Sequence, residues 1–250
     1  MLRWVFFLRY PDGVSKDDGE RWYLGTHTQE AKHLQGLRRY RSWKALKAST
    51  APPWTTVDSL NRWDRVTELA FDDWDGWHEA AVKHVPEYTP APYGARGFEF
   101  ETIFIQDERD DDFLRSSPAP GSLNASDTDR LVRWLFILRY GKNTTKEAGE
   151  DWYLGTHTQE AKQMHGLRRY VSWRAQAGPA SLIALAPPKW DRLTELAFAD
   201  FDAWADGAVT QMPQWTPPPY GQPGFLSETV FIRERPEYDL LAEIPTVDRR

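Results

Sequence analysis

The sequence contains no cysteine among its 250 residues, and it has only three methionines and six histidines. Without cysteine the chain can form neither a disulfide framework nor a thiolate site for zinc or an iron–sulfur cluster, and it has no thiol nucleophile. The formal net charge of −6 argues against a nucleic-acid binder, whose affinity would come from phosphate contacts. No apolar run approaches the roughly 18 residues of a membrane-spanning helix. The short apolar run near the N-terminus lacks a small-residue cleavage site and is typical of a first strand, so we expect a cytoplasmic protein.

Aromatic residues are abundant instead: the chain has 13 Trp, 12 Phe and 10 Tyr. Such large rings can fill a core or line an apolar concavity that suits a flat ligand. Hydrophobic residues make up 40% of the chain and charged residues 27%, which is an ordinary globular composition. We therefore expect a small hydrophobic or aromatic molecule as the partner, and neither a nucleic acid nor a membrane.

The chain is a tandem repeat. Residues 3–43 align with residues 133–173 at an offset of 130, and 27 of the 41 positions are identical. The run WYLGTHTQEAK occurs unchanged at 22–32 and 152–162. Two repeats of this length are too few and too long for a solenoid, so they indicate a duplicated domain.

The later part of each half repeats at an offset of 127, as in WDRVTELAF and WDRLTELAF. The acidic and then Ser/Pro/Gly-rich stretch between the halves is typical of a linker, and short Pro/Ala/Ser-rich insertions inside each half, at 48–60 and 175–189, are typical of loops. The predicted organisation is a first domain, a linker, a second domain and a tail, at residues 1–107, 108–130, 131–235 and 236–250.

Hydrophobic periodicity predicts the order β-α-β-β-α-β in each half. In the first half the expected strands and helices are a strand at 3–10, a helix at 16–34 that stops before Gly36, strands at 37–46 and 63–71, a helix that begins near Asp72 and Asp73, and a strand at 101–105. This order is that of the ferredoxin-like fold, and the fold class is α+β.

A ferredoxin-like sheet has its helices on one face, so the other face must be covered by something else. Two tandem copies can cover each other by packing sheet against sheet. The sequence therefore predicts an intrachain dimeric α+β barrel, either as a monomer with an internal pseudo-dimer or as a further homodimer.

The order of motifs resembles the EthD-like family of the dimeric α+β barrel superfamily. The resemblance rests on WYLGTHTQEAK, then GLRRY, an Asp with a Glu four residues later (DRVTELAF), an acidic-aromatic helix and a late strand, and it covers both halves. Thr26 and Thr156 stand where the family often has an acidic residue. The resemblance implies a cleft that holds a small, often aromatic, molecule and that places the helix-borne His at this cleft. It does not fix the reaction, because the superfamily includes lyases, isomerases, monooxygenases and some haem enzymes.

His27 and its copy His157 are the candidate general acids or bases, because histidine exchanges protons near neutral pH. Tyr23 and Tyr153 lie one helical turn earlier on the same face, where each could orient the imidazole. The alternative is a structural histidine that bonds the backbone at the edge of the core.

Glu68 and Glu195 are the second pair of catalytic candidates. Alternation along the strand predicts that they point into the barrel, where a buried carboxylate must be paired or have a raised pKa. Each is either a structural partner of an arginine or a polar anchor in the pocket, and we expect the His and the Glu of each half to line one cavity. The expected substrate-binding residues are Tyr23, Tyr153, Arg9, Arg139, Arg38, Arg168, Tyr40, Tyr170, Trp22 and Trp152.

No metal site and no cofactor are expected. The histidines lack a partner His at ligand spacing, and the P-loop, dinucleotide-binding and zinc-protease motifs are absent. The sequence favours a cofactor-free lyase or isomerase that transfers protons on a small aromatic compound. The alternatives are a non-catalytic binding protein and a cofactor-free monooxygenase of the same superfamily.

Overall fold

The computed structural model describes residues 1–94, 97–108, 111–114, 130–179 and 188–242. The first half contains β1 (Leu2–Arg9), α1 (Lys16–Trp22), η1 (Tyr23–His27), α2 (Thr28–Ala31), β2 (Arg39–Lys44), α3 (Val57–Leu60), β3 (Arg65–Phe71), α4 (Trp74–His78), η2 (Glu79–Lys83) and β4 (Glu99–Gln106). The second half contains β6 (Val132–Tyr140), α6 (Lys146–Trp152), η3 (Tyr153–His157), α7 (Thr158–Ala161), β7 (Leu167–Arg174), β8 (Arg192–Phe198), α8 (Phe201–Ala205), η4 (Asp206–Thr210) and β9 (Phe225–Arg233). Two short strands, β5 (Asp111–Asp112) and β10 (Tyr238–Asp239), follow the halves.

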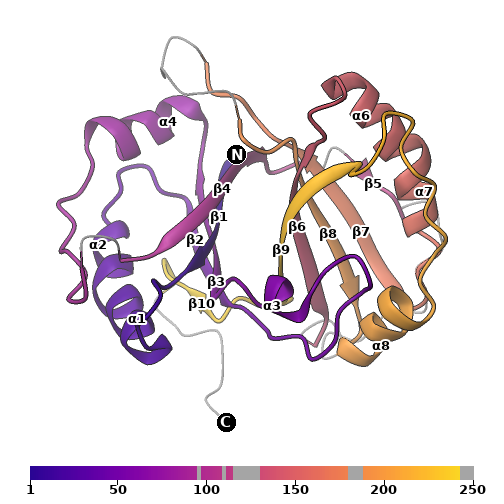
Figure 1. Cartoon of the computed structure of the whole chain (residues 1–250). Coiled ribbons are helices and arrows are strands. Elements are labelled where there is room, and N and C mark those ends of the chain that lie inside the picture. Colours follow the sequence, from indigo (N-terminus) through magenta and orange to yellow (C-terminus); the bar gives the residue numbers. More distant parts are fainter. Residues whose placement is uncertain (95–96, 109–110, 115–129, 180–187, 243–250) are drawn as a thin grey trace.

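Each half is a ferredoxin-like unit with an antiparallel sheet, as the sequence predicts. The strand orders are β10-β2-β3-β1-β4 and β5-β7-β8-β6-β9. The two sheets face each other, and the helices cover their outer faces (Figure 1). The fold is therefore α+β, with two halves packed sheet to sheet as an intrachain dimeric α+β barrel.

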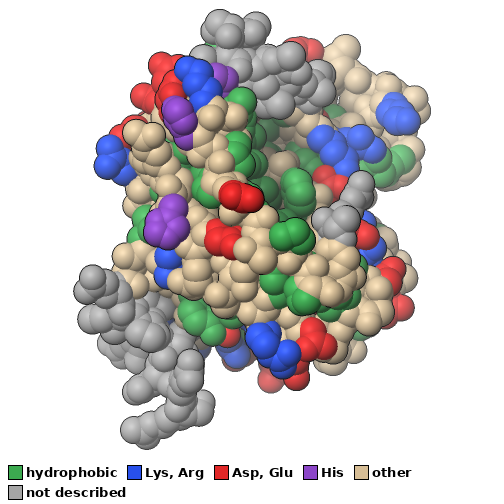
Figure 2. Space-filling model, turned by 90° about the vertical axis from the view of Figure 1, so that its left-hand side faces the viewer, with side chains coloured by type: hydrophobic (Ala, Val, Ile, Leu, Met, Phe, Trp, Pro, Cys, Tyr) green, Lys and Arg blue, Asp and Glu red, His purple; other side chains and the backbone are tan. Residues whose placement is uncertain are grey.

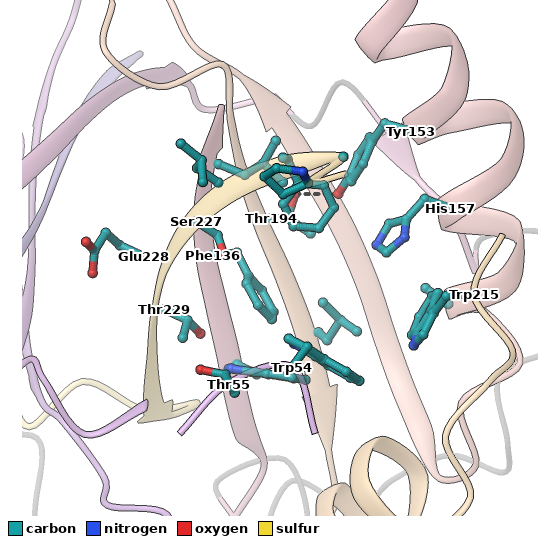
Figure 3. A pocket seen from close by; sticks show the side chains of 18 of the residues that line it. Trp54, Thr55, Phe136, Tyr153, His157, Thr194, Trp215, Ser227, Glu228 and Thr229 are labelled. Atoms are coloured by element: carbon teal, nitrogen blue, oxygen red, sulfur yellow. Dashed lines mark hydrogen bonds between the residues drawn. The ribbon is translucent and has the colours of Figure 1, made fainter. Parts of the chain in front are cut away.

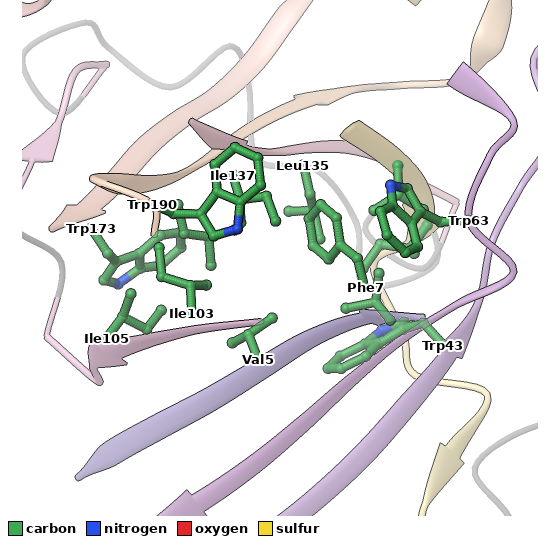
Figure 4. Close-up of a cluster of buried hydrophobic side chains, with 14 of the residues drawn as sticks. Val5, Phe7, Trp43, Trp63, Ile103, Ile105, Leu135, Ile137, Trp173 and Trp190 are labelled. Carbon is green, nitrogen blue, oxygen red and sulfur yellow. The ribbon is translucent and has the colours of Figure 1, made fainter. Parts of the chain in front are cut away.

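The barrel interior holds the apolar side chains that alternate along each strand. Val5 and Phe7 of β1 face Leu135 and Ile137 of β6, and four tryptophans from both halves fill the space around them (Figure 4). All members of this cluster are buried. The core therefore belongs to both halves at once, and neither sheet could bury its inner face alone.

The edges of the two sheets are joined by matching backbone bonds. The amide of Leu46 donates to the carbonyl of Phe231 at 2.8 Å, and the amide of Gln176 donates to that of Phe104 at 2.8 Å. Each bond runs from the end of the second strand of one half to the last strand of the other. The sheets thus close on each other with pseudo-twofold symmetry.

The predicted linker and tail each contribute a strand to the opposite half. Asp111 and Asp112 pair with β7 of the second sheet, and Tyr238 and Asp239 pair with β2 of the first (Figure 1). Both segments are too short to give a periodic pattern, so the sequence carries no sign of these pairings. The exchange ties the two halves together beyond their shared core.

Most elements lie where periodicity places them, with ends shifted by a few residues. The first helix ends at Ala31 instead of Leu34, since a turn follows before Gly36, whose φ is +75°. The expected loop at 48–60 contains the helical turn α3, which is capped by the side chain of Thr56. Residues 180–187 of the matching loop lie outside the described part of the chain.

Candidate functional site

A cavity of about 590 Å³ lies in the second half, between the outer face of the sheet and the helix that contains η3. Tyr153 and His157 project into it from η3, Phe136 and Thr194 line it from the sheet, and Trp54 closes it from the first half (Figure 3). Its volume is within the range of small-molecule sites. Most of its wall is aromatic or aliphatic, so the cavity suits a flat, largely apolar ligand.

The imidazole of His157 is stacked between two aromatic rings. Its ring centroid is 4.8 Å from that of Trp215, at 24° between planes, and 5.5 Å from that of Tyr153, at 25°. Trp152 and Phe225 approach it at 5.3 and 5.1 Å. Stacking on these rings therefore holds the orientation of the imidazole.

The His157 imidazole is neutral at physiological pH. Burial among aromatic rings lowers the pKa of His157 to about 4, although the nearby Glu160 carboxylate acts in the opposite direction. Within the described residues neither ring nitrogen has a hydrogen-bond partner. One nitrogen can thus accept a proton or a hydrogen bond from a ligand in the cavity, and the other can donate.

A π-helical turn places this histidine in both halves. In η3 the amide of Thr158 bonds the carbonyl of Tyr153 five residues earlier, and in η1 the amide of Thr28 bonds that of Tyr23. The wider turn rotates the side chains that follow it, and such turns are frequent at functional sites. The identical run YLGTH therefore produces the same local geometry twice.

Glu160 holds in place the segment that carries Trp215, the ring stacked on His157. Its carboxylate accepts the amide of Thr216 at 3.1 Å, next to Trp215. Glu30 does the same for Thr89 in the first half. In each half, the glutamate one turn after the histidine thus positions the segment whose aromatic ring stacks on the histidine.

Behind the cavity, the Tyr153 hydroxyl belongs to a buried polar network. It bonds the Thr194 hydroxyl at 2.8 Å, which bonds the Ser172 hydroxyl at 2.9 Å. The fully buried Arg192 lies 5.6 Å over the Tyr153 ring and is neutralised by Asp111 of the exchanged strand β5. Burial raises the pKa of Tyr153, so it remains a neutral phenol.

The expectation that His and Glu share a cavity is wrong. Thr194 and Glu195 are successive residues of β8, so their side chains lie on opposite faces of the sheet. Glu195 points into the barrel, where Arg133 donates to it at 3.0 Å and Arg169 at 2.5 Å. Burial would raise the pKa of Glu195, but the two guanidinium charges outweigh it and hold this pKa at about 2.

Glu68 has the same surroundings in the first half. Arg3 donates to it at 2.9 Å and Arg39 at 3.1 Å, and Arg3 also lies 5.1 Å over the Trp173 ring of the opposite sheet. Both glutamates therefore match the structural alternative, a buried ion pair between neighbouring strands. Neither one faces the helix-borne histidine.

The four arginines expected to bind substrate do not line the cavity. Arg9 bonds Glu99 at 2.8 Å, and Arg139 lies 6.0 Å over the Trp190 ring. Arg38 is exposed and paired with Asp72, and Arg168 is exposed. Arg9 and Arg139 lie on the barrel face of their strands, so the sheet separates them from the cavity, whereas Arg38 and Arg168 lie at the start of β2 and β7, outside the cavity wall.

The aromatic candidates of the second half, Trp152, Tyr153 and Tyr170, do line the cavity. The ring of Trp152 lies against Gly224, where a Cβ atom would come within 2.6 Å of it. Sequence reasoning missed Trp54, because nothing in the chain order indicates that a loop of the first half reaches the second.

The first half repeats the histidine surroundings but not the cavity wall. Its corresponding aromatic candidates, Trp22, Tyr23 and Tyr40, are buried, and the His27 ring stacks on Tyr88 at 4.9 Å. The Phe98 ring also lies next to His27, with 5.1 Å between the ring centroids. Phe100 stands where the second half has Ser227, and it packs on Phe6 at 5.5 Å and on Phe98 at 5.9 Å. A large ring thus takes the place of a small hydroxyl.

The described side chains on the outer face of the first half include both acidic and basic groups (Figure 2). Hydrophobic side chains gather near its middle, and acidic and basic side chains are scattered around them (Figure 2). None of the helices among the described residues is long and apolar enough to span a membrane.

The described side chains do not form a metal site. In the part of the chain that the structure describes, no group of three or more His, Asp or Glu side chains could hold one. A haem iron needs only one axial ligand, which His157 could supply. However, among the described residues that line the cavity, only Arg62 carries a positive charge for propionates, and it is bonded to Glu228. The wall therefore fits a haem poorly.

No family model and no curated protein sequence matches this chain. Among solved structures it is similar to an anthrone oxidase-like protein, at 13% identity over 97% of this chain and 96% of that one, with a TM-score of 0.49. It is also similar to a mutant chlorite dismutase from Candidatus Nitrospira defluvii, at 9% identity over 92% and 91%, with a TM-score of 0.45. A monooxygenase-like protein from Lactobacillus acidophilus matches at 9% identity over 94% and 97%, with a TM-score of 0.34. Similarities this distant do not assign an activity.

Proposed function

We propose that the chain is an enzyme that binds a flat, uncharged aromatic small molecule in the second-half cavity and transfers a proton on it through His157. One observation carries the proposal: a neutral imidazole, whose nitrogens have no hydrogen-bond partner among the described residues, is stacked between two aromatic rings in an apolar cavity. The reaction class is that of a lyase or isomerase. A relationship to the EthD-like family remains part of this proposal.

The wall chemistry supports an uncharged ligand. Arg62 and Glu228, the two charged side chains among the described residues that line the cavity, bond each other at 2.5 Å. The Glu228 carboxylate points away from His157 (Figure 3). A charged ligand would lose its hydration without finding a free counter-ion, which is unfavourable. The hydroxyl groups of Thr55 and Ser227 can bind a carbonyl or a phenol instead, whereas Thr229 donates to the Leu135 carbonyl at 2.9 Å and can only accept from a phenol.

The proton transfer follows from the state of His157. Because its pKa is about 4, the imidazole is unprotonated at neutral pH and can accept a proton, but its basicity is low. It takes a proton from an acidic C–H or O–H group of the ligand, which leaves an anion beside an imidazolium. In a cavity of low polarity the attraction of this contact pair offsets part of the cost of forming both charges. The proton then returns to another atom of the ligand, or a leaving group departs with the electron pair.

Anthrone is a suitable probe, because it is a planar three-ring ketone with an exchangeable CH₂ group. In deuterated buffer the protein should accelerate hydrogen–deuterium exchange at this carbon, measured by mass spectrometry. His157→Phe keeps the stacked ring but has no proton acceptor, so it should lower the catalysed rate by roughly 10²-fold or more. The matched control His27→Phe should leave the rate unchanged.

Binding is measured separately by quenching of tryptophan fluorescence. His157→Phe should bind anthrone within a few-fold of the unaltered protein. Binding without catalysed exchange would identify a non-catalytic binding protein and contradict the proposal. Consumption of oxygen on adding anthrone would instead select the monooxygenase alternative.

A further inference from the structure

The loop at residues 47–63, here the roof loop, leaves the first sheet after β2 and extends over the second half before it returns to β3 (Figure 1). Two of its side chains, Ala48 and Leu60, are buried in the helix-side core of the second half, in one cluster with Trp134 and Phe198. The roof loop is thus part of the second half in packing, although it belongs to the first in sequence.

Side-chain bonds hold the base of the roof loop closed. Lys47 donates to the carbonyls of Asn61 and Trp63 at 2.8 and 2.7 Å. The Asn61 amide group bonds the backbone of Ala48 in both directions, at 2.8 and 2.9 Å. These bonds join the two ends of the loop, so its tip is positioned by a fixed base.

A second anchor connects the roof loop to the rim of the cavity. Arg62 bonds Glu228 of β9 at 2.5 Å, and the indole of Trp63 donates to the same carboxylate at 3.2 Å. In the other direction, Lys189 and Trp190 of the second half bond Glu101 of β4. The roof loop is thereby fixed against the strand that forms one wall of the cavity.

The tip of the roof loop continues the row of rings that holds His157. Trp54 lies edge-on to Trp215 at 6.0 Å and 88°, and Trp215 is the ring stacked on His157. Trp54 is nevertheless 50% exposed, which is unusual for a large ring beside an apolar cavity. A ligand stacked along the row would cover part of this exposed surface.

We infer that Trp54 determines the size of ligand that the cavity accepts, so that the first half supplies the specificity of a site whose reactive group belongs to the second. The inference rests on the proposed function. The chemical class is planar ketones and phenols of two or three fused rings. A longer ring system would meet the indole of Trp54 at the end of the row.

The test compares dissociation constants for 1-naphthol, anthrone and benzanthrone, which have two, three and four fused rings, by fluorescence. Trp54→Ala should raise the dissociation constant for anthrone by about tenfold. The dissociation constant for benzanthrone divided by that for anthrone should fall by at least tenfold, which is a shift of preference toward benzanthrone. Trp54→Phe should give dissociation constants between those of the unaltered protein and those of Trp54→Ala. Val85→Ala is the control, because Val85 is an equally exposed apolar side chain outside the roof loop.

The outcomes separate this inference from the proposed function. If Trp54→Ala and Trp54→Phe both keep the ratio within twofold of the unaltered protein, the inference is overturned while anthrone exchange through His157 still stands. If the unaltered protein binds none of the three compounds, the proposed function fails first. Circular dichroism of both Trp54 variants verifies that they fold.

Discussion

Replacing His157 by Phe should remove a specific part of the pH dependence of stability. The pKa of His157 is about 4 in the folded chain, whereas a histidine in an unfolded chain has a pKa near 6.5. Between these values the unfolded chain binds a proton that the folded chain does not. The free energy of unfolding therefore falls as the pH drops from about 6.5 to about 4.

The magnitude follows from the two pKa values. At 1.36 kcal/mol for each pKa unit, the contribution of His157 decreases stability by about 2–3 kcal/mol between pH 7.5 and pH 4.5. For a chain of this size that corresponds to a difference in melting temperature of roughly 5–10 °C. The His157→Phe variant keeps the stacked ring and has no titrating group. Between pH 7.5 and pH 4.5 it should therefore lose about 2–3 kcal/mol less stability than the unaltered protein.

The assay is urea unfolding of both proteins at pH 7.5 and pH 4.5. The quantity of interest is the loss of unfolding free energy in the unaltered protein minus that in the variant. Carboxylates that titrate in the same range cancel in this comparison. His27→Phe should give a similar difference, since burial also lowers the pKa of His27 to about 4. Parallel pH profiles of the variant and the unaltered protein would refute the reasoning, because His157 would then accept a proton in the folded state at little cost.

Three further predictions concern the barrel. Glu195→Gln should destabilise the fold by about 1–3 kcal/mol, because the half-buried Arg133 and Arg169 lose a shared carboxylate while Glu234 still pairs with Arg169, and anthrone binding per folded molecule should persist, as urea unfolding and fluorescence can establish. Asp111→Asn should cost about 1–3 kcal/mol by weakening the neutralisation of the buried Arg192, so that an unchanged melting temperature would argue against a role for the exchanged strand. Residues 1–107 alone should sediment as a dimer or aggregate, since their inner sheet face is uncovered, and a stable monomer with a cooperative melt would contradict the shared core.

The sequence was sufficient for features that depend on local pattern. Alternation along the strands predicts both faces of each sheet, and it places Glu68 and Glu195 inside the barrel. The repeated run YLGTH predicts a histidine on the same helix face in each half. The uncovered sheet faces then require the two halves to pack together, so the barrel follows from pattern and burial.

The sequence could not identify which candidates would meet in one site. Thr194 and Glu195 are neighbours in the chain, yet the sheet separates the hydroxyl that bonds Tyr153 from the carboxylate in the barrel. Resemblance between the halves also hid a difference, since Phe100 and Ser227 occupy matching positions of β4 and β9 but fill different volumes on the outer face of the sheet. Such differences depend on volumes and distances that chain order does not contain.

By itself, then, the sequence determined the duplication, the ferredoxin-like order of each half and the helix-borne His157, because these depend on residues close together in the chain. Only the tertiary structure decided that Trp54 lies near His157, about a hundred positions away, and that Asp111 neutralises Arg192 across the boundary of the halves. The physical reason is that a loop finds its place by burying side chains such as Leu60 against whatever apolar surface the assembled barrel presents.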